Sequence, residues 1–156
     1  MSQIVLGQTG FHVEQNAFGA LPIQRISKDD AIHLVQRAVR GGMNCFDTAR
    51  VYTDSEEKLG EALEGFRQDV IVLTKTASVD AQSFWKDLHT SLRLLKTDYI
   101  DIYQFHNLPF CPMPGDQSGL YEAMLQAKQA GKIRAIGITN HRMAVARQAI
   151  ESGLYE

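Results

Sequence analysis

Apolar positions along the chain follow two alternating patterns. Short runs rich in β-branched side chains predict strands, and stretches with apolar residues three or four positions apart predict amphipathic helices. The first two runs, residues 3–6 and 11–14, flank Gly7-Gln8-Thr9-Gly10 and predict a hairpin. Further strands are predicted at residues 17–20, 44–46, 70–74, 99–105 and 133–138. Two helices are predicted to begin after Ser27 and Asp54, and three more are predicted over residues 81–96, 120–130 and 143–152.

Two of these helices begin at residues that predict capping. Ser27 with Asp30 predicts an N-cap, and Asp54 with Glu57 predicts an acidic variant of the capping box. The expected buried faces are Ala31, Leu34, Val35 and Ala38 in the first helix, Leu59, Ala62, Leu63 and Phe66 in the second, Phe84, Leu88, Leu92 and Leu95 in the third, and Leu120, Ala123, Met124, Ala127 and Ala130 in the fourth.

Strands separated by single helices predict a parallel sheet with right-handed crossovers. Two architectures fit this pattern, an open doubly wound sheet and a closed (β/α)8 barrel. An open nucleotide-binding sheet usually carries G-x-G-x-x-G after its first strand. Here only Gly19 precedes Ala20-Leu21-Pro22, which disfavours the open sheet without excluding it.

Composition narrows the class of protein. The 156 residues are 44% hydrophobic and 22% charged, with 16 Lys+Arg against 18 Asp+Glu. A nucleic-acid groove needs clustered positive charge, which this sequence lacks. It also shows no membrane-length apolar run and no signal peptide, and Cys45 and Cys111 have no metal-ligand spacing. We therefore expect a cytoplasmic α/β protein with no metal, nucleic acid or membrane partner.

Polar residues at the ends of the predicted strands are the candidate chemistry, because both architectures place their sites at the carboxyl ends of strands. Asp47 and Tyr52 follow one strand, Lys75 and His106 follow the next two, and Thr139-Asn140 follow the last. Each residue alone is more often structural, as a turn aspartate, a packing tyrosine or a core histidine. Together on one rim, they predict a site.

The residue types define a chemical hypothesis. A tyrosine hydroxyl titrates near ~10, and a nearby ammonium such as Lys75 is expected to lower that value. Asp47 would neutralise the ammonium, and His106 would hydrogen-bond a substrate carbonyl. Such a pocket protonates an oxygen that develops negative charge when hydride reaches a carbonyl carbon. No side chain donates hydride, so the hypothesis requires a nicotinamide cofactor.

The same residues carry a family resemblance. Residues 42–52 (GMNCFDTARVY) and 55–60 (SEEKLG) resemble the signature of the aldo-keto reductase superfamily. Lys75 in LTK, His106 in DIYQFHN and residues 137–140 (GITN) are similar to its later motifs, as is the opening hairpin.

This resemblance implies a (β/α)8 TIM barrel and NAD(P)H-dependent reduction of an aldehyde or ketone, a small-molecule carbonyl substrate. Tyr52 would be the proton donor, supported by Lys75 and Asp47, and His106 would orient the carbonyl. Asp47, Thr139 and Asn140 would bind the cofactor, with the last two holding the nicotinamide carboxamide. NADPH is the family's usual cofactor, and NADH is the alternative.

Length limits these expectations, because a barrel of this kind needs about 250 residues. We expect residues 1–156 to be the N-terminal part of a single barrel domain, an incomplete barrel with about five strands and five helices plus the hairpin. The missing C-terminal half, or self-association, is expected to cover the open sheet edges. The implied phosphate-binding loops follow later strands, so this chain alone should be weakly active or inactive. A non-catalytic cofactor-binding regulatory or scaffold subunit remains the alternative function.

Overall fold

The structure is a computed structural model that describes residues 3–156. An antiparallel hairpin, β1 (Gln3–Val5) and β2 (His12–Glu14), precedes a five-stranded parallel sheet. The sheet strands are β3 (Phe18–Gly19), β4 (Cys45–Asp47), β5 (Ile71–Thr76), β6 (Ile100–His106) and β7 (Ile133–Thr139). Their spatial order is their chain order, whereas a doubly wound sheet reverses its order at a switch point. The fold is therefore that of an incomplete (β/α)8 barrel, as the sequence predicted.

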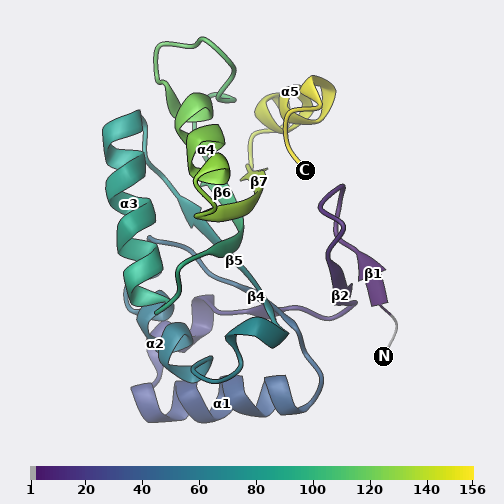
Figure 1. Cartoon of the computed structure of the whole chain (residues 1–156), viewed down its shortest axis with the longest axis vertical. Coiled ribbons are helices and arrows are strands. Elements are labelled where there is room, and N and C mark those ends of the chain that lie inside the picture. The colour runs from purple at the N-terminus through teal and green to yellow at the C-terminus, as the bar shows by residue number, and fades with distance from the viewer. Residues whose placement is uncertain (1–2) are drawn as a thin grey trace.

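One helix connects each pair of neighbouring strands. The helices are α1 (Lys28–Arg40), α2 (Ser55–Ala62), α3 (Ala81–Leu94), α4 (Leu120–Gln129) and α5 (Met143–Ser152), with 3-10 turns η1 (Leu21–Arg25) and η2 (Arg67–Asp69). In Figure 1, α2, α3 and α4 line one side of the strands, α1 runs across the bottom of the view, and the hairpin stands on the opposite side. Among residues 3–156, no helix has the length and apolar character needed to cross a bilayer.

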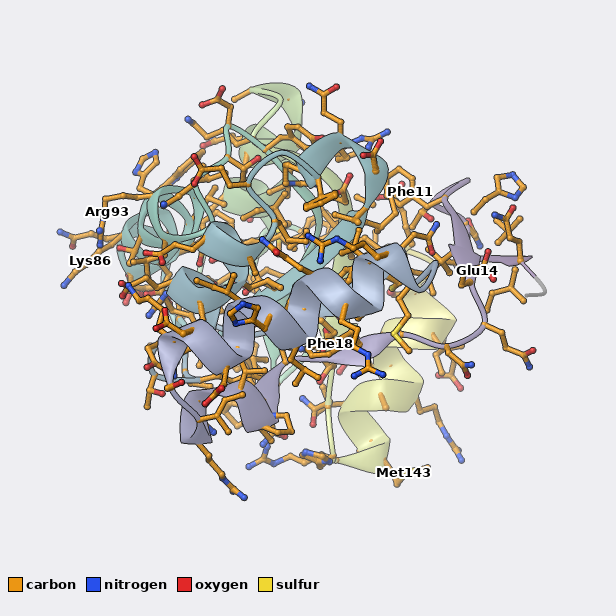
Figure 2. All side chains as sticks on the ribbon, turned by 90° about the horizontal axis from the view of Figure 1, so that it is seen from below. Phe11, Glu14, Phe18, Lys86, Arg93 and Met143 are labelled. Carbon is orange, nitrogen blue, oxygen red and sulfur yellow. The ribbon has the colours of Figure 1, made fainter. Side chains whose placement is uncertain are left out.

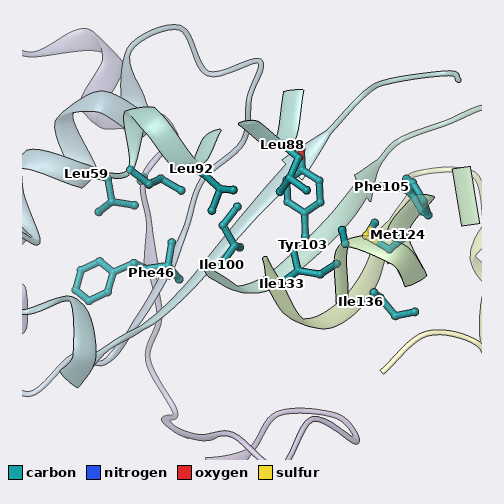
Figure 3. Close-up of a cluster of buried hydrophobic side chains, with 14 of the residues drawn as sticks. Phe46, Leu59, Leu88, Leu92, Ile100, Tyr103, Phe105, Met124, Ile133 and Ile136 are labelled. Carbon is teal, nitrogen blue, oxygen red and sulfur yellow. The ribbon is translucent and has the colours of Figure 1, made fainter. Parts of the chain in front are cut away.

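The core lies between the helices and the sheet (Figure 3). Tyr103 and Phe105, on the helix-facing side of β6, are fully buried, and the ring of Tyr103 meets Phe84 of α3 at 5.6 Å between centroids. Continuous burial along β6 is typical of a parallel strand covered by helices. This core holds the strands, and thus their carboxyl ends, in fixed positions.

Three residues predicted to lie on the buried faces of helices are either exposed or outside the helix. Leu34 of α1 is 47% exposed, because α1 packs through Ala31 and Val35, whose small or branched side chains bring its axis close to the core. Phe66 is half-buried beyond the end of α2, and Ala130 is exposed after the last residue of α4. The amphipathic pattern identified the helices correctly, but it overestimated the width of the buried face of α1 and the lengths of α2 and α4.

One of the two predicted caps is confirmed. The Ser27 hydroxyl accepts the main-chain N–H of Asp30 at 3.1 Å, as an N-cap does. Asp54 precedes α2, but its carboxylate makes no capping bond. It pairs instead with the Lys58 ammonium at 2.8 Å, because that buried ammonium requires a carboxylate partner. The capping-box prediction for Asp54 and Glu57 was therefore wrong.

The hairpin is attached to the sheet by polar and aromatic contacts. The Asn44 side chain accepts the Glu14 main-chain N–H at 2.8 Å and donates to the His12 carbonyl at 3.1 Å. The Arg134 guanidinium lies 4.6 Å from the ring centroid of Phe11. Figure 2 shows Phe11 and Glu14 to one side of the helical body. These contacts hold the hairpin near the N-terminal ends of β4 and β7.

Candidate active site

The predicted site residues lie at one edge of the sheet. Asp47, His106 and Thr139 end β4, β6 and β7, and Lys75 is the second-last residue of β5. Strand register sets His106 beside Thr139 and places Lys75 beside Gln104, two residues before His106. Parallel pairing therefore brings together residues that are far apart in the sequence.

Lys75 forms the electrostatic centre of this edge. Its ammonium donates to both carboxylate oxygens of Asp47, at 2.7 and 2.6 Å, and to the Thr48 carbonyl at 2.7 Å. The Lys75 side chain is only 8% exposed, and that of Asp47 is 36% exposed. Since an ammonium has three hydrogens, all of its donors are used, and its charge is neutralised by Asp47.

Tyr52 lies between this ion pair and His106. The Lys75 ammonium is 5.6 Å from the centroid of the Tyr52 ring. The Tyr52 and His106 rings meet edge to face, with centroids 5.8 Å apart and planes at 85°. No hydrogen-bond partner for the Tyr52 hydroxyl occurs among residues 3–156. The hydroxyl is therefore free to bond to a ligand.

The expected lowering of the Tyr52 pKa was wrong. Burial raises the pKa of Tyr52 above its ordinary value, and the negative charge of Asp47 raises it further. The Lys75 ammonium does not reverse this, because its charge is neutralised by the Asp47 carboxylate, to which it donates at 2.7 and 2.6 Å. In this geometry, Tyr52 stays protonated at neutral pH and can serve as a proton donor.

His106 is held as a neutral ring. Burial lowers the pKa of His106, and the positive charge of Lys75 lowers it further. Within the described chain, its buried Nδ1 atom has no hydrogen-bond partner. A neutral imidazole carries one N–H donor and one acceptor, so His106 can donate a hydrogen bond to a carbonyl oxygen.

Thr139 and Asn140 keep free capacity for a carboxamide ligand. The Asn140 amide donates to the Leu108 carbonyl at 2.7 Å, and its oxygen accepts the Arg142 main-chain N–H at 2.8 Å. One N–H and one lone pair of that amide remain unused, which is the complement of another carboxamide. The Thr139 hydroxyl has no partner in residues 3–156. These two residues therefore fit the nicotinamide end of a cofactor.

A concavity of about 450 Å³ lies at the β7 edge of the sheet, between the sheet, the hairpin, α5 and the C-terminal residues. Its lining includes Leu73, Ile102, Gln104, Ile138 and Asn140. Asn140 alone of the candidate site residues borders it, so this concavity is not formed by the residues around Tyr52. Among residues 3–156, no group of three or more His, Cys, Asp or Glu side chains is placed to hold a metal.

Sequence reasoning missed two parts of this edge. Thr48 contributes a main-chain carbonyl to Lys75, and any residue type offers that group, so no sequence signal exists for it. The Arg142 guanidinium donates to the Asn107 carbonyl at 3.1 Å and to its side-chain oxygen at 3.3 Å. Asn107 follows His106 directly and has a positive φ of 54°, which asparagine tolerates better than most residues. Its pairing with Arg142 depends on tertiary placement.

The comparisons of this chain with known proteins agree on one family. The model of the aldo/keto reductase family matches residues 3–155. L-galactose dehydrogenase of Arabidopsis thaliana is 37% identical over 149 residues, which cover 86% of this chain and 47% of the relative. Methylglyoxal reductase DkgB of Salmonella typhi is 33% identical over 142 residues, covering 86% of this chain and 51% of the relative.

Solved structures agree with the fold. The holo form of aldo-keto reductase AKR11C1 from Bacillus halodurans superposes with a TM-score of 0.86 at 30% identity, over 97% of this chain and 54% of the other. A Klebsiella pneumoniae aldo-keto reductase in complex with NADPH gives a TM-score of 0.82 at 25% identity, over 97% and 54%. The chain spans about half the length of the curated relatives it matches. Since the family match extends over nearly every residue, this chain belongs to the aldo/keto reductase family.

Proposed function

We propose that the protein carrying this site reduces an aldehyde or ketone to an alcohol, with NADPH as hydride donor and Tyr52 as proton donor. The observation that carries the proposal is the state of Tyr52: its hydroxyl is unpaired within residues 3–156, its pKa is raised, and its ring packs against His106. A protonated phenol beside a neutral imidazole is suited to an oxygen that gains negative charge.

The names of the relatives support this reaction type. One relative is a methylglyoxal reductase, another is an L-galactose dehydrogenase, and one neighbouring structure holds NADPH. These are properties of those proteins, and this chain spans about half of their length. Carbonyl reduction by the whole protein is therefore our proposal, and a small-molecule carbonyl is its proposed substrate.

Each residue has a separate task in the proposed reaction. NADPH would supply the hydride to the carbonyl carbon. Tyr52 would donate its proton to the carbonyl oxygen, and the N–H of neutral His106 would orient that oxygen. Lys75 and Asp47 would keep the surroundings of the phenol near electrical neutrality, since they neutralise each other at 2.6 Å.

Asp47, Thr139 and Asn140 are the proposed cofactor-binding residues. The unused N–H and lone pair of Asn140 would pair with the nicotinamide carboxamide, and the Thr139 hydroxyl would add one more bond.

We also propose that the protein is cytoplasmic. The two edge strands, β3 and β7, would be covered by further barrel strands or by self-association.

Replacing Tyr52 by Phe tests the proposed function. NADPH oxidation by the whole protein would be followed with methylglyoxal and a panel of other aldehydes, and its NADPH binding would be titrated separately by fluorescence. Loss of the proton donor should slow reduction by about 10²–10⁴-fold. NADPH affinity should stay nearly constant, because the phenol oxygen is not a proposed cofactor contact.

The matched control is Tyr99→Phe, which also removes a phenol oxygen. Tyr99 lies under the Arg67 guanidinium and just before β6, at the end of that strand opposite to His106. Equal rates for wild type and Tyr52→Phe would contradict the proposal. A wild-type protein that binds NADPH tightly and reduces none of the aldehydes would favour the cofactor-binding regulatory subunit instead.

A further inference from the structure

The turn that carries Tyr52 is closed by a buried ion pair. The Arg50 guanidinium contacts the outer carboxylate oxygen of Glu56, so a charged pair joins the residues on either side of the turn. The Glu56 side chain is 1% exposed and that of Arg50 is 18% exposed. Neither residue has a role in the reaction proposed above.

Glu56 is also attached to the strand that supplies Lys75. Its other carboxylate oxygen accepts the Thr74 hydroxyl at 2.6 Å and the Ser91 hydroxyl at 2.7 Å. Thr74 immediately precedes Lys75 on β5, and Ser91 lies on α3. One buried carboxylate therefore connects the end of the turn to a strand and to a helix.

Arg50 makes the corresponding attachment at the start of the turn. Its main-chain N–H donates to the carbonyl of Lys75 at 2.9 Å. Between Arg50 and Glu56, Thr53 has a φ of 42°, a left-handed conformation that costs free energy in a residue with a Cβ branch. The surrounding contacts must hold this turn in place, and the ion pair is one of them.

Stability alone does not account for a buried ion pair at this position. Removing two charges from water costs about as much as their attraction returns, and apolar replacements are often as stable. A charged pair does fix geometry more tightly than an apolar contact, because each partner accepts only a few directions of approach.

We propose that Arg50 and Glu56 are positioning residues whose ion pair holds the Tyr52 ring against His106. The proposal rests on the assignment of Tyr52 as proton donor, and neither residue touches the reacting atoms. The pair acts through the turn: it joins Arg50, at the start of the turn, to Glu56, which is bonded to Thr74, and Tyr52 lies between.

The test is the nuclear Overhauser effect between ring protons of Tyr52 and His106, measured on the 156-residue chain. Glu56→Gln keeps an oxygen for Thr74 and Ser91 but removes the charge that binds Arg50. The matched control, Glu57→Gln, makes the same change at the next residue, whose side chain is 44% exposed and paired with Lys28. We expect the ring–ring effect to be lost in Glu56→Gln and kept in Glu57→Gln.

A second pair of variants keeps the test decisive if Glu56→Gln folds poorly. Arg50→Met removes the partly exposed partner and should also abolish the ring–ring effect, whereas Arg50→Lys keeps a positive charge and should restore part of it. The double variant Arg50→Met/Glu56→Gln should be no worse than either single variant, because the two act as one unit. An unchanged effect in the folded Glu56→Gln or Arg50→Met chain would overturn the proposal.

Turnover provides an independent comparison. Where reduction is measured, Glu56→Gln should lower kcat by about 100-fold with little change in NADPH affinity, as expected for a displaced proton donor. The two proposals fail separately. Full activity of Tyr52→Phe would overturn the proposed function, whereas a persistent ring–ring effect without the ion pair would overturn only the positioning role.

Discussion

At the scale of single residues, the site depends on where the three hydrogens of Lys75 point. They point to Asp47 and Thr48, so the ammonium stabilises the turn after β4 and leaves Tyr52 protonated. The sequence predicted which residues meet, because strand ends converge in a parallel sheet. It could not predict the direction of the Tyr52 pKa shift, which depends on burial and on hydrogen-bond directions.

The pH dependence of His106 follows from its burial. Because burial and Lys75 lower the pKa of His106 from 6.5, its protonation should occur below pH 6.5. Between the folded pKa and pH 6.5, His106 binds a proton in the unfolded chain but stays neutral in the folded chain. The stability contributed by the neutral ring is therefore complete above about pH 6.5 and lost as pH falls through the folded pKa. An NMR titration of the His106 ring measures the midpoint of its protonation, which is the pH at which half of the rings carry a proton.

Replacing Lys75 by Met should raise that midpoint. The substitution removes a positive charge that lowers the His106 pKa and leaves the Asp47 carboxylate, which raises it. Lys96→Met is the matched control, since Lys96 is an exposed lysine paired with Glu64. A midpoint that stays constant or falls in Lys75→Met would show that Lys75 does not control His106.

At the scale of elements, Gly60 explains part of the SEEKLG motif. A Cβ atom on Gly60 would lie 2.7 Å from the Cα of Leu95, within the main chain at the end of α3. The α2 helix can therefore approach α3 only with glycine at this point. The contact brings together α2, which carries Glu56, and α3, which carries Ser91.

Gly60→Ala should lower the free energy of unfolding by about 1–3 kcal/mol, although alanine is the better helix former. The two helices must separate, because the obstructing atoms are backbone. Urea denaturation of the wild type and the variant measures the change. Gly19→Ala is the control, since a Cβ at Gly19 meets no atom within 4 Å. Equal losses in the two variants would contradict close packing at Gly60.

Elements were predicted more accurately than their contacts. The hairpin, the five parallel strands and α5 lie where periodicity placed them, because strand and helix patterns are local. The exposure of Leu34 and the Asp54–Lys58 pair were not predictable. The first depends on how much of α1 the sheet covers, and the second on the need of a buried ammonium for a carboxylate, and both are tertiary effects.

At the scale of the whole molecule, the described strands carry only the nicotinamide side of the proposed cofactor site. Asp47, Thr139 and Asn140 lie on β4, β7 and the loop after it. The resemblance assigns the pyrophosphate and 2′-phosphate contacts to loops of later strands, which barrels commonly use to hold phosphate.

The 156-residue chain should therefore bind NADPH and reduced nicotinamide mononucleotide with similar, weak affinity. The second ligand lacks the adenosine half, so it tests whether that half contributes to binding. Calorimetric titration of both ligands against the same chain measures the ratio, and Asn140→Ala is the variant that should weaken both alike. Micromolar affinity for NADPH together with a much weaker mononucleotide would show that this chain has its own site for the adenosine half.

The identical order of the sheet strands in space and along the chain has a consequence for folding during synthesis. Each strand from β4 to β7 pairs with the strand made just before it. None of these four strands must wait for a distant partner to begin pairing, so each loop to be closed spans one crossover only, and this part of the sheet can grow as the chain leaves the ribosome. The turn of Tyr52 can adopt its final form only after α3 has emerged, because Ser91 supplies the last bond to Glu56.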